Sequence, residues 1–343
     1  MNVLVTGGAG YIGSHTCLAL LKADMDIAII DNLINSHYEA VERVMALAGR
    51  RFPFYEGDVC DEALLDKVFQ AHSFDCVIHF AGLKAVGESV DKPLDYYANN
   101  LLSTISLSKA MIKHGVMRLI FSSSATVYLA DSPMPVNEDA PLGCINPYGW
   151  TKYMCEQILR DTACATPGFS AVLLRYFNPI GADESGMIGE DPEGIPNNLV
   201  PFITQTALGR QKVLQVFGDD YDTPDGTGVR DYIHVDDLAQ GHIAAMRYAM
   251  KHTGAEAFNL GTGTGYSVLD IVHAFEKVNR VKVPYVIAPR RPGDAATVYA
   301  NPDKAKAVLQ WTAQKTLNDM CRDSWRWQSN NPNGYAGDAQ TEE

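Results

Sequence analysis

The sequence lacks long hydrophobic runs and has little positive charge. No stretch approaches the roughly 18 consecutive apolar residues that a membrane-spanning helix needs. The N-terminal segment MNVLVTGGAGYIG has no basic region followed by an apolar core, so no secretory signal is expected. Lys and Arg number 28 against 41 Asp and Glu, which gives a net charge of −13. Because such a surface repels phosphate polymers and anionic lipids, we expect neither nucleic acids nor membranes as partners.

Cysteine is also sparse, and it is not arranged in pairs. The seven cysteines are scattered without a C-x-x-C spacing, and the nine histidines show no metal-ligand spacing. This pattern argues against a disulfide framework and against a zinc site. We therefore expect no metal, and we expect a cytoplasmic protein with reduced thiols.

The first 180 residues alternate between short apolar runs and helical patterns. Continuous apolar runs predict strands that are buried on both faces of a parallel sheet. They lie at 3–5, 27–30, 76–78, 119–121 and 171–174. Apolar residues at spacings of three or four predict helices at 91–114 and 148–160. This alternation is typical of an α/β fold with a Rossmann-type, doubly wound parallel sheet.

From about residue 180 the sequence changes in character. Segments 181–198 and 218–228 are rich in Gly, Pro and Asp and are predicted to be loops, with helices predicted at about 199–209, 236–252 and 267–279. We expect residues 1–180 to form the main domain and later segments, such as 229–255, to return to it. Residues 181–335 would form mainly a smaller α/β substrate lobe, and 336–343 a frayed tail.

The strongest local motif follows the first predicted strand. Gly7, Gly10 and Gly13 form G-x-x-G-x-x-G before a helix that is predicted from about Tyr11. A tight strand-to-helix turn without side chains lets backbone N–H groups and the helix N-terminus face a pyrophosphate. The alternative is a plain glycine turn.

Two acidic residues follow apolar runs in the first third of the chain. Asp31 lies 18 residues beyond Gly13, where a carboxylate can accept hydrogen bonds from an adenosine ribose and would repel a 2′-phosphate. Asp31 therefore favours NAD over NADP as the cofactor. Asp58 follows the run at 52–55 and suits an adenine amino group, or equally the N-cap of a helix.

Tyr148 and Lys152 form a Y-x-x-x-K pair, which places both side chains on one face of a helix. A Lys ammonium there would stabilise a tyrosinate and lower a pKa that is ordinarily about 10. The tyrosinate could then act as a general base on a sugar or alcohol hydroxyl. Ser124, which follows the run at 119–121, could hydrogen-bond the reacting hydroxyl. The alternatives are an exposed pair on a helix surface and a Ser-rich turn.

These motifs, in this order, resemble the extended short-chain dehydrogenase/reductase superfamily. Further strings resemble one of its families, the UDP-glucose 4-epimerases. They are HFAGLKAVGES at 79–89, RYFNP at 175–179, GEDP at 189–192, IPNNL at 195–199, GTGVRDYIHV at 226–235 and WRWQ at 325–328. The resemblance covers nearly the whole chain, to about residue 335.

The resemblance implies an isomerase that holds NAD tightly. Tyr148 would remove the proton from the 4-OH of a UDP-sugar while a hydride moves from C4 to the nicotinamide. The 4-keto sugar would rotate, and hydride return would interconvert UDP-galactose and UDP-glucose. Lys152 would bind the nicotinamide ribose and lower the pKa of Tyr148, helped by the cationic nicotinamide ring, and Ser124 would bind the 4-oxygen. The resemblance also implies a homodimer through the helices at 91–114 and 148–165.

The same resemblance assigns binding residues. The NAD site would include Gly7, Gly10, Tyr11, Ile12, Gly13, Asp31, Asn32, Leu33, Asn35, Ser36, Asp58, Val59, Phe80, Ala81, Gly82, Lys84, Asn99, Ser122, Tyr148, Lys152 and Phe177. The UDP-sugar site would include Lys84, Ser124, Ala125, Thr126, Tyr148, Asn178, Asn198, Leu199, Phe217, Arg230, Arg291, Asp294 and Val298. Val298 stands where some members of the family carry a bulky Tyr over the sugar 2-position. The substrates could therefore include UDP-N-acetylglucosamine and UDP-N-acetylgalactosamine.

Other activities of the superfamily stay open at this point. One alternative is another nucleotide-sugar epimerase, and a second is a reductase that exchanges NADPH, which Asp31 disfavours. A third is a 4,6-dehydratase or a decarboxylase. Dehydratases of the superfamily need an Asp–Glu pair after the serine, where this sequence has Ala125 and Thr126. A non-catalytic NAD-sensing protein would have no need of Ser124, Tyr148 and Lys152 together.

Overall fold

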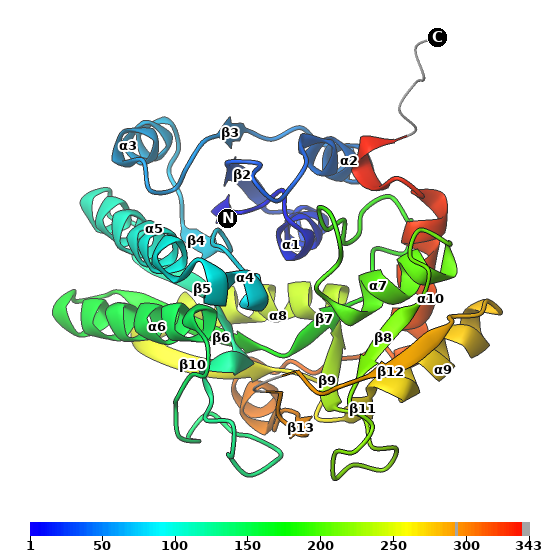
Figure 1. Ribbon diagram of the computed structural model, residues 1–343. Helices are drawn as coiled ribbons and strands as arrows, with labels where there is room; N and C mark the ends of the chain where they lie inside the picture. Colours follow the sequence, from blue (N-terminus) through cyan, green and yellow to red (C-terminus); the bar gives the residue numbers. More distant parts are fainter. Residues whose placement is uncertain (292–293, 338–343) are drawn as a thin grey trace.

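The central sheet is parallel, and its strands contain the short apolar runs of the sequence. The computed structural model describes residues 1–291 and 294–337, and its main sheet has seven strands in the order β10-β6-β5-β4-β1-β2-β3 (Figure 1). They are β1 (Asn2–Thr6), β2 (Asp26–Asp31), β3 (Phe54–Glu56), β4 (Cys76–His79), β5 (Arg118–Ser124), β6 (Ser170–Tyr176) and β10 (Gly254–Leu260). From β1 the chain first adds β2 and β3 on one side and then β4, β5, β6 and β10 on the other, as in doubly wound nucleotide-binding folds. The predicted fold class is confirmed.

Helices cover both faces of this sheet, which explains why its strands have no polar face. Val3 and Val5 of β1 belong to the core that includes α1 (Tyr11–Lys22), α2 (Tyr38–Ala48) and α8 (Val235–Ala249). Leu4 belongs to the opposite core, with α3 (Glu62–Ala71), α5 (Pro93–Lys113) and α6 (Pro147–Ala165). Successive side chains of a strand point to opposite faces, so each strand contributes to both cores. A short helix, α4 (Val86–Asp91), precedes α5.

The second half of the chain adds two smaller sheets and a third core. The strands β7 (Asn178–Ile180), β9 (Val229–His234), β11 (Gly265–Ser267) and β13 (Thr297–Val298) form one sheet, and β8 (Leu214–Phe217) pairs with β12 (Tyr285–Ala288). Helices α7 (Leu199–Ala207), α9 (Val268–Asn279) and α10 (Leu317–Asn330) pack around the third core. Short helical turns lie at Ala125–Val127, Ala305–Leu309 and Gly334–Ala336.

The predicted strands and helices are confirmed with small shifts of their ends, and segments 181–198 and 218–228 contain no helix or strand. Helix α8 packs on α1, and β10 forms the edge of the main sheet beside β6. The boundary at residue 180 stays a prediction. Of the predicted tail, Ala336 and Gly337 are exposed, and 338–343 lie outside the described residues. Among the described helices, none is long and apolar enough to span a bilayer.

Candidate active site

The glycine turn leads from β1 into α1 and leaves no room for side chains. A Cβ atom on Gly7, which has φ +73°, would lie 2.6 Å from the Ala81 backbone nitrogen, and one on Gly13 would lie 2.2 Å from the Gly7 carbonyl oxygen. Gly10 is the N-cap of α1, and no side chain caps this helix end. The first N–H groups of α1 therefore face a cradle that a pyrophosphate fits.

Asp31 ends β2 and connects the loop that follows it to the glycine turn. Its Oδ2 atom accepts the Ala9 N–H at 2.9 Å, and its Oδ1 atom accepts the Leu33 N–H at 3.0 Å and the Ser36 hydroxyl at 2.8 Å. A carboxylate has about four acceptor positions, so Asp31 can still accept a ribose hydroxyl. Asn32 and Asn35 are exposed on the same loop. This arrangement fits the adenosine half of a dinucleotide.

Asp58 lies beside the loop that Asp31 holds, but it is not a helix cap. Its Oδ1 atom accepts the Cys60 N–H at 2.7 Å, and its Oδ2 atom lies 3.4 Å from the Asn32 amide nitrogen. The N-cap of α3 is Asp61, whose side chain accepts two N–H groups of the first turn. The N-cap alternative for Asp58 is therefore wrong, because the N-cap lies three residues later, at Asp61.

The other residues predicted for the dinucleotide lie on separate elements. Ile12, Leu33 and Phe80 pack against the core on the α1 side of the sheet, whereas Val59 is buried in the opposite core. The hydroxyl of Tyr11 donates to the Gly181 carbonyl oxygen at 2.7 Å. Ala81 and Gly82 follow β4, Asn99 lies on α5, and Phe177 follows β6. Among the described residues, no hydrogen bond or ion pair joins these side chains to one another.

Tyr148 and Lys152 lie one turn apart at the start of α6, next to the end of β5. Asn146 caps α6 by accepting the Gly149 N–H at 2.8 Å, and Pro147 occupies the first turn. The Lys152 Nζ atom donates to the Ser122 carbonyl oxygen at 2.6 Å and lies 5.8 Å from the centroid of the Tyr148 ring. The structure therefore brings together the residues that the Y-x-x-x-K motif and the serine run indicate.

Ser124 ends β5 with its hydroxyl proton directed away from its own turn. The Ser124 Oγ atom accepts hydrogen bonds from the Thr126 N–H at 3.2 Å and from the Thr126 hydroxyl at 3.0 Å. Because both contacts use lone pairs, the Ser124 hydroxyl can donate its proton to another group, and the Ser124 side chain lies close enough to Tyr148 to lower its pKa. Thr126 therefore orients the serine.

The pKa of Tyr148 is raised above its ordinary value of 10. Burial raises this pKa to about 12, and the hydrogen bond with Ser124 opposes that rise. Burial also lowers the pKa of Lys152 to about 8. The Lys152 ammonium is held by the Ser122 carbonyl, and the expectation that it lowers the pKa of Tyr148 stays a prediction. A positive charge close to Tyr148 would favour the tyrosinate.

Four residues predicted for the UDP-sugar gather beside β13. The Asp294 carboxylate lies 2.9 Å from the Arg291 Nε atom and 3.9 Å from the Arg230 guanidinium. The Arg291 guanidinium carbon lies 4.9 Å from the centroid of the Phe217 ring. Val298 pairs with Arg230 in register between β13 and β9. A pocket of about 430 Å³ borders this group and is lined by Ala130, Asp131, Ile145, Asp294, Ala295, Ala296 and Thr297.

Lys84 and Asn198 meet at a carboxylate that the motif analysis left without a role. The Glu190 Oε1 atom accepts the Asn198 side-chain amide at 2.6 Å and lies 3.6 Å from the Lys84 ammonium. Asn198 is at the N-cap position of α7 but makes no side-chain cap, and Leu199 begins that helix, whereas Asn178 begins β7 and is exposed. Glu190 could have been found only through its place in the GEDP string, since Lys84 lies far away in sequence and no motif links Glu190 to Asn198, eight residues on.

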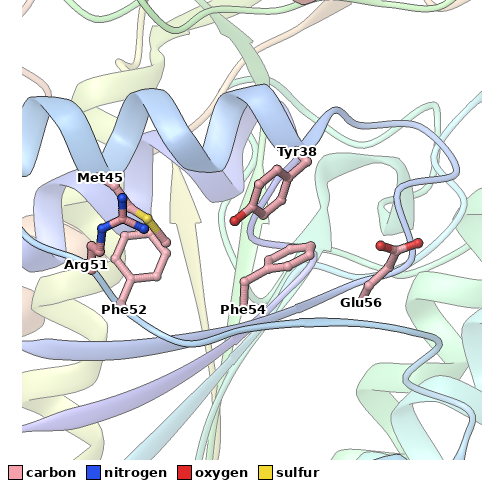
Figure 2. Close-up of a pocket in the computed structure, with 6 residues that line it drawn as sticks. All are labelled: Tyr38, Met45, Arg51, Phe52, Phe54 and Glu56. Carbon is pink, nitrogen blue, oxygen red and sulfur yellow. The ribbon is translucent and has the colours of Figure 1, made fainter.

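A second pocket, of about 410 Å³, lies away from these residues, between α2 and the edge strand β3 (Figure 2). Figure 2 shows the Tyr38 ring of α2 facing the Phe54 ring of β3, with their centroids 4.9 Å apart. Met45, Arg51, Phe52 and Glu56 complete its lining. No predicted site residue lines this pocket, so it is not the candidate active site. Among the described residues, no cluster of His, Cys, Asp and Glu could hold a metal ion.

Comparison with known proteins identifies the family. A family model described as GDP-mannose 4,6 dehydratase matches residues 4–324. The UDP-glucose 4-epimerase of Bacillus subtilis is 59% identical over 335 residues, which cover 98% of this chain and 99% of that protein. The chain belongs to the UDP-glucose 4-epimerase family. The resemblance to the extended short-chain dehydrogenase/reductase superfamily is thereby confirmed.

Solved structures of the family agree with the fold over nearly all of the chain. The UDP-glucose 4-epimerase of Bifidobacterium longum, in complex with NAD+ and UDP, is 54% identical with a TM-score of 0.94, over 97% of this chain and 100% of that one. The enzyme of Stenotrophomonas maltophila, with bound NAD and formylated UDP-arabinopyranose, is 47% identical with a TM-score of 0.94, over 96% and 98%. Dinucleotide and nucleotide-sugar sites thus occur together in this fold.

The substitution Lys152→Met tests the buried ammonium. Because folding lowers the pKa of Lys152 from its ordinary 10.5 to about 8, the unfolded chain binds more protons than the folded chain between these values. The free energy of unfolding of the wild type should therefore rise with pH relative to Lys152→Met in this window, by up to about 3 kcal/mol. Urea unfolding at a series of pH values measures the difference. A difference that does not change with pH would contradict the lowered pKa.

Proposed function

We propose that this chain catalyses the NAD-dependent interconversion of UDP-galactose and UDP-glucose by inverting C4 of the sugar. The observation that carries the proposal is the juxtaposition of Ser124, Tyr148 and Lys152 at the end of β5 in a chain of this family. The activity is that of an isomerase, with no net oxidation. The family membership and the NAD-bound relatives support both the reaction and the cofactor.

The residues present fit NAD. The glycine cradle at α1 would hold the pyrophosphate, Asp31 the adenosine ribose, and Lys152 the nicotinamide ribose. The chemistry that NAD supplies when bound is acceptance of a hydride from C4 of the sugar and its return to the opposite face. Its oxidised ring would also add a positive charge, besides that of Lys152, that favours the tyrosinate form of Tyr148.

The side chains at the end of β5 move and hold the proton. Tyr148, as the tyrosinate, accepts the proton of the sugar 4-OH, and Ser124 donates a hydrogen bond to the 4-oxygen because Thr126 occupies its lone pairs. Tyr148 later returns the same proton to the 4-oxygen. Lys152 stays beside Tyr148, fixed by the Ser122 carbonyl. Proton and hydride are both restored, so the reaction balances without an outside oxidant.

The cations beside β13 suit the diphosphate of a UDP-sugar. Arg230 and Arg291 share the carboxylate of Asp294, and Lys84 lies next to that of Glu190. Phosphate oxygens accept stronger, charge-assisted hydrogen bonds from such groups. In a protein with a net charge of −13, a local group of cations is what permits an anionic substrate to bind.

A 4,6-dehydratase is the alternative that the description of the family model raises. Elimination of water across C5 and C6 needs side chains that can accept and donate protons there. Ala125 carries no titratable group, and the hydroxyl of Thr126 donates to Ser124. Epimerisation, which needs acid–base chemistry at the 4-oxygen alone, is therefore favoured.

Purified protein with UDP-galactose and no added cofactor should form UDP-glucose, because NAD need not leave the enzyme. Removing the general base in Tyr148→Phe should lower kcat by about 10²–10⁴-fold. Tyr153→Phe, on the same helix, is the matched control and should keep wild-type activity. Product analysis by chromatography measures both. If wild-type protein contains NAD yet forms no UDP-glucose, the assignment of UDP-galactose as substrate is wrong.

Val298 supports a wider sugar range. It is half-buried and packs in a small apolar cluster with Ala125 and Phe177, next to Ser124. We infer that its small side chain leaves space at the 2-position of the sugar. The N-acetyl group of UDP-N-acetylglucosamine or UDP-N-acetylgalactosamine would occupy that space.

Val298→Tyr should fill this space and selectively impair the acetylated substrates. We expect the ratio of kcat/KM for UDP-N-acetylgalactosamine to that for UDP-galactose to fall at least about tenfold. Val298→Thr keeps the volume and serves as the control. An unchanged ratio in Val298→Tyr would show that residue 298 does not select the sugar.

An apolar surface over α5 and α6 supports a homodimer. Leu94 and Leu102 of α5 are 79% and 48% exposed, and Trp150 and Met154 of α6 are 36% and 38% exposed. Trp150 and Met154 lie on one face of α6 because they are four residues apart, and Figure 1 shows the two helices side by side. We infer that a second copy covers this surface.

The cysteines support a cytoplasmic location. All seven of them are free, as is usual in a reducing compartment. Cell fractionation would test this location.

The double substitution Leu102→Glu with Met154→Glu should convert the dimer to a monomer, because two buried charges would oppose association. Sedimentation velocity measures the state. Val286→Glu, at a residue of β12 that is also 48% exposed, should leave the dimer intact. The dimer proposal fails if the wild type sediments as a monomer or if the double variant still sediments as a dimer.

A further inference from the structure

We infer that Glu156 and Arg175 are positioning residues that act through Ser123 to set the distance between Ser124 and Tyr148. The inference deepens the proposed function and rests on it for the catalytic consequence. Arg175 begins the RYFNP string, but neither it nor Glu156 was assigned a role in binding or in the reaction. Glu156, Arg175 and Ser123 are each at most 1% exposed, so none of them touches a substrate from solvent.

The hydrogen bonds of Glu156 join α6 to two strands at once. The Glu156 Oε1 atom accepts the Ser123 hydroxyl at 2.6 Å and the Arg175 Nε–H at 2.9 Å, while its Oε2 atom accepts the Arg175 Nη2 at 2.7 Å. Ser123 and Arg175 are register partners on β5 and β6. The carboxylate therefore fixes both strands at the residue that precedes Ser124.

The first turns of α6 carry Tyr148, the proposed general base, and two residues that contact β5. Tyr148, Lys152 and Glu156 recur every fourth residue, so they lie on one face of α6. Lys152 meets the Phe121 ring at 5.0 Å and the Ser122 carbonyl, and Glu156 meets Ser123 one turn later. Helix and strand are thus fixed at two successive turns. The distance between Tyr148 and Ser124 then depends on the contact at the second turn, between Glu156 and Ser123.

Arg175 also holds the segment that follows β5. Its Nη1 atom donates to the Tyr128 hydroxyl at 3.0 Å and to the Glu138 carbonyl oxygen at 3.2 Å, and the Tyr128 hydroxyl donates to Asn259 at 2.6 Å. These contacts hold the segment that follows Ser124 and Thr126. The residues on both sides of Ser124 are therefore fixed by one buried ion pair.

A role in packing alone does not account for this network. A buried ion pair is commonly no more stabilising than apolar residues of similar volume, because desolvation offsets the attraction. An apolar pair could not accept the Ser123 hydroxyl, and it would leave the direction of that side chain unspecified. The directional bond from Ser123 to Glu156 is the part of the network that bears on the active site.

The test removes only that bond. Substituting Glu156 would leave Arg175 as an uncompensated buried charge, and substituting Arg175 would leave Glu156 with only the more distant Arg160, at 3.7 Å, so either change would endanger folding. Ser123→Ala keeps the ion pair intact and cuts its link to β5. Ser108→Ala is the matched control, since Ser108 is also buried and its hydroxyl bonds only the Thr104 carbonyl of its own helix. Ser123→Thr retains the hydroxyl and serves as the conservative variant.

Kinetics on UDP-galactose and crystal structures of the NAD-bound variants give independent readings. For Ser123→Ala we expect kcat to fall about ten- to hundredfold with KM and bound NAD unchanged. Its Ser124 Oγ to Tyr148 Oη distance should lengthen by about 0.5 Å or more. Ser123→Thr should restore both values, and Ser108→Ala should alter neither.

The outcomes separate this inference from the proposed function. An unchanged distance in Ser123→Ala, or a loss of kcat that Ser108→Ala shares, would overturn the positioning role. Equal changes in kcat, KM and NAD content would point to general destabilisation and would overturn it as well. A lengthened distance in a protein whose wild type does not act on UDP-galactose would uphold the positioning role and reject the proposed function.

Discussion

The parallel register of the central sheet is the constraint on which the site depends. Because all seven strands run in one direction, their carboxyl ends lie at one edge. The turn after β1, the carboxylate that ends β2 and the serine that ends β5 all reach this edge. They come from positions 7, 31 and 124 of the chain, and no local interaction could assemble them. The sheet thus supplies the alignment, and the loops beyond it supply the chemistry.

Charge within the site is balanced by carboxylates of the protein. Arg230 and Arg291 share Asp294, and Lys84 lies beside Glu190. Each cation near the proposed diphosphate site therefore already has an acidic partner, which limits the cost of holding like charges together. Tyr148 and Lys152 have no such partner, and burial pushes the pKa of each toward its neutral form. The two kinds of site suit different tasks, namely binding an anion and moving a proton.

The parts that sequence could predict are those with local spacing. The strands follow from continuous apolar runs, and Gly7, Asp31 and Tyr148 follow from motifs whose members lie within one turn or one strand–helix unit. The pairings of Glu190 with Lys84 and of Glu156 with Arg175 join residues far apart in sequence, and no periodicity marks them. The N-cap of α3 shows the same limit on a small scale, because Asp58 and Asp61 are both plausible from sequence and only the helix start decides.

The residues proposed to transfer the proton and the residue proposed to select the sugar lie in different parts of the fold. Ser124 and Tyr148 are held by the main sheet and by a buried network of hydrogen bonds. Val298 lies on a two-residue strand of a smaller sheet, joined to the segment after β5 by the bridge between Val136 and Ala300. Under the proposed function, a change at residue 298 would alter the sugar pocket from this smaller sheet, whereas Ser124 and Tyr148 belong to the main sheet and to α6. The range of accepted sugars would then be set by other elements than those that transfer the proton.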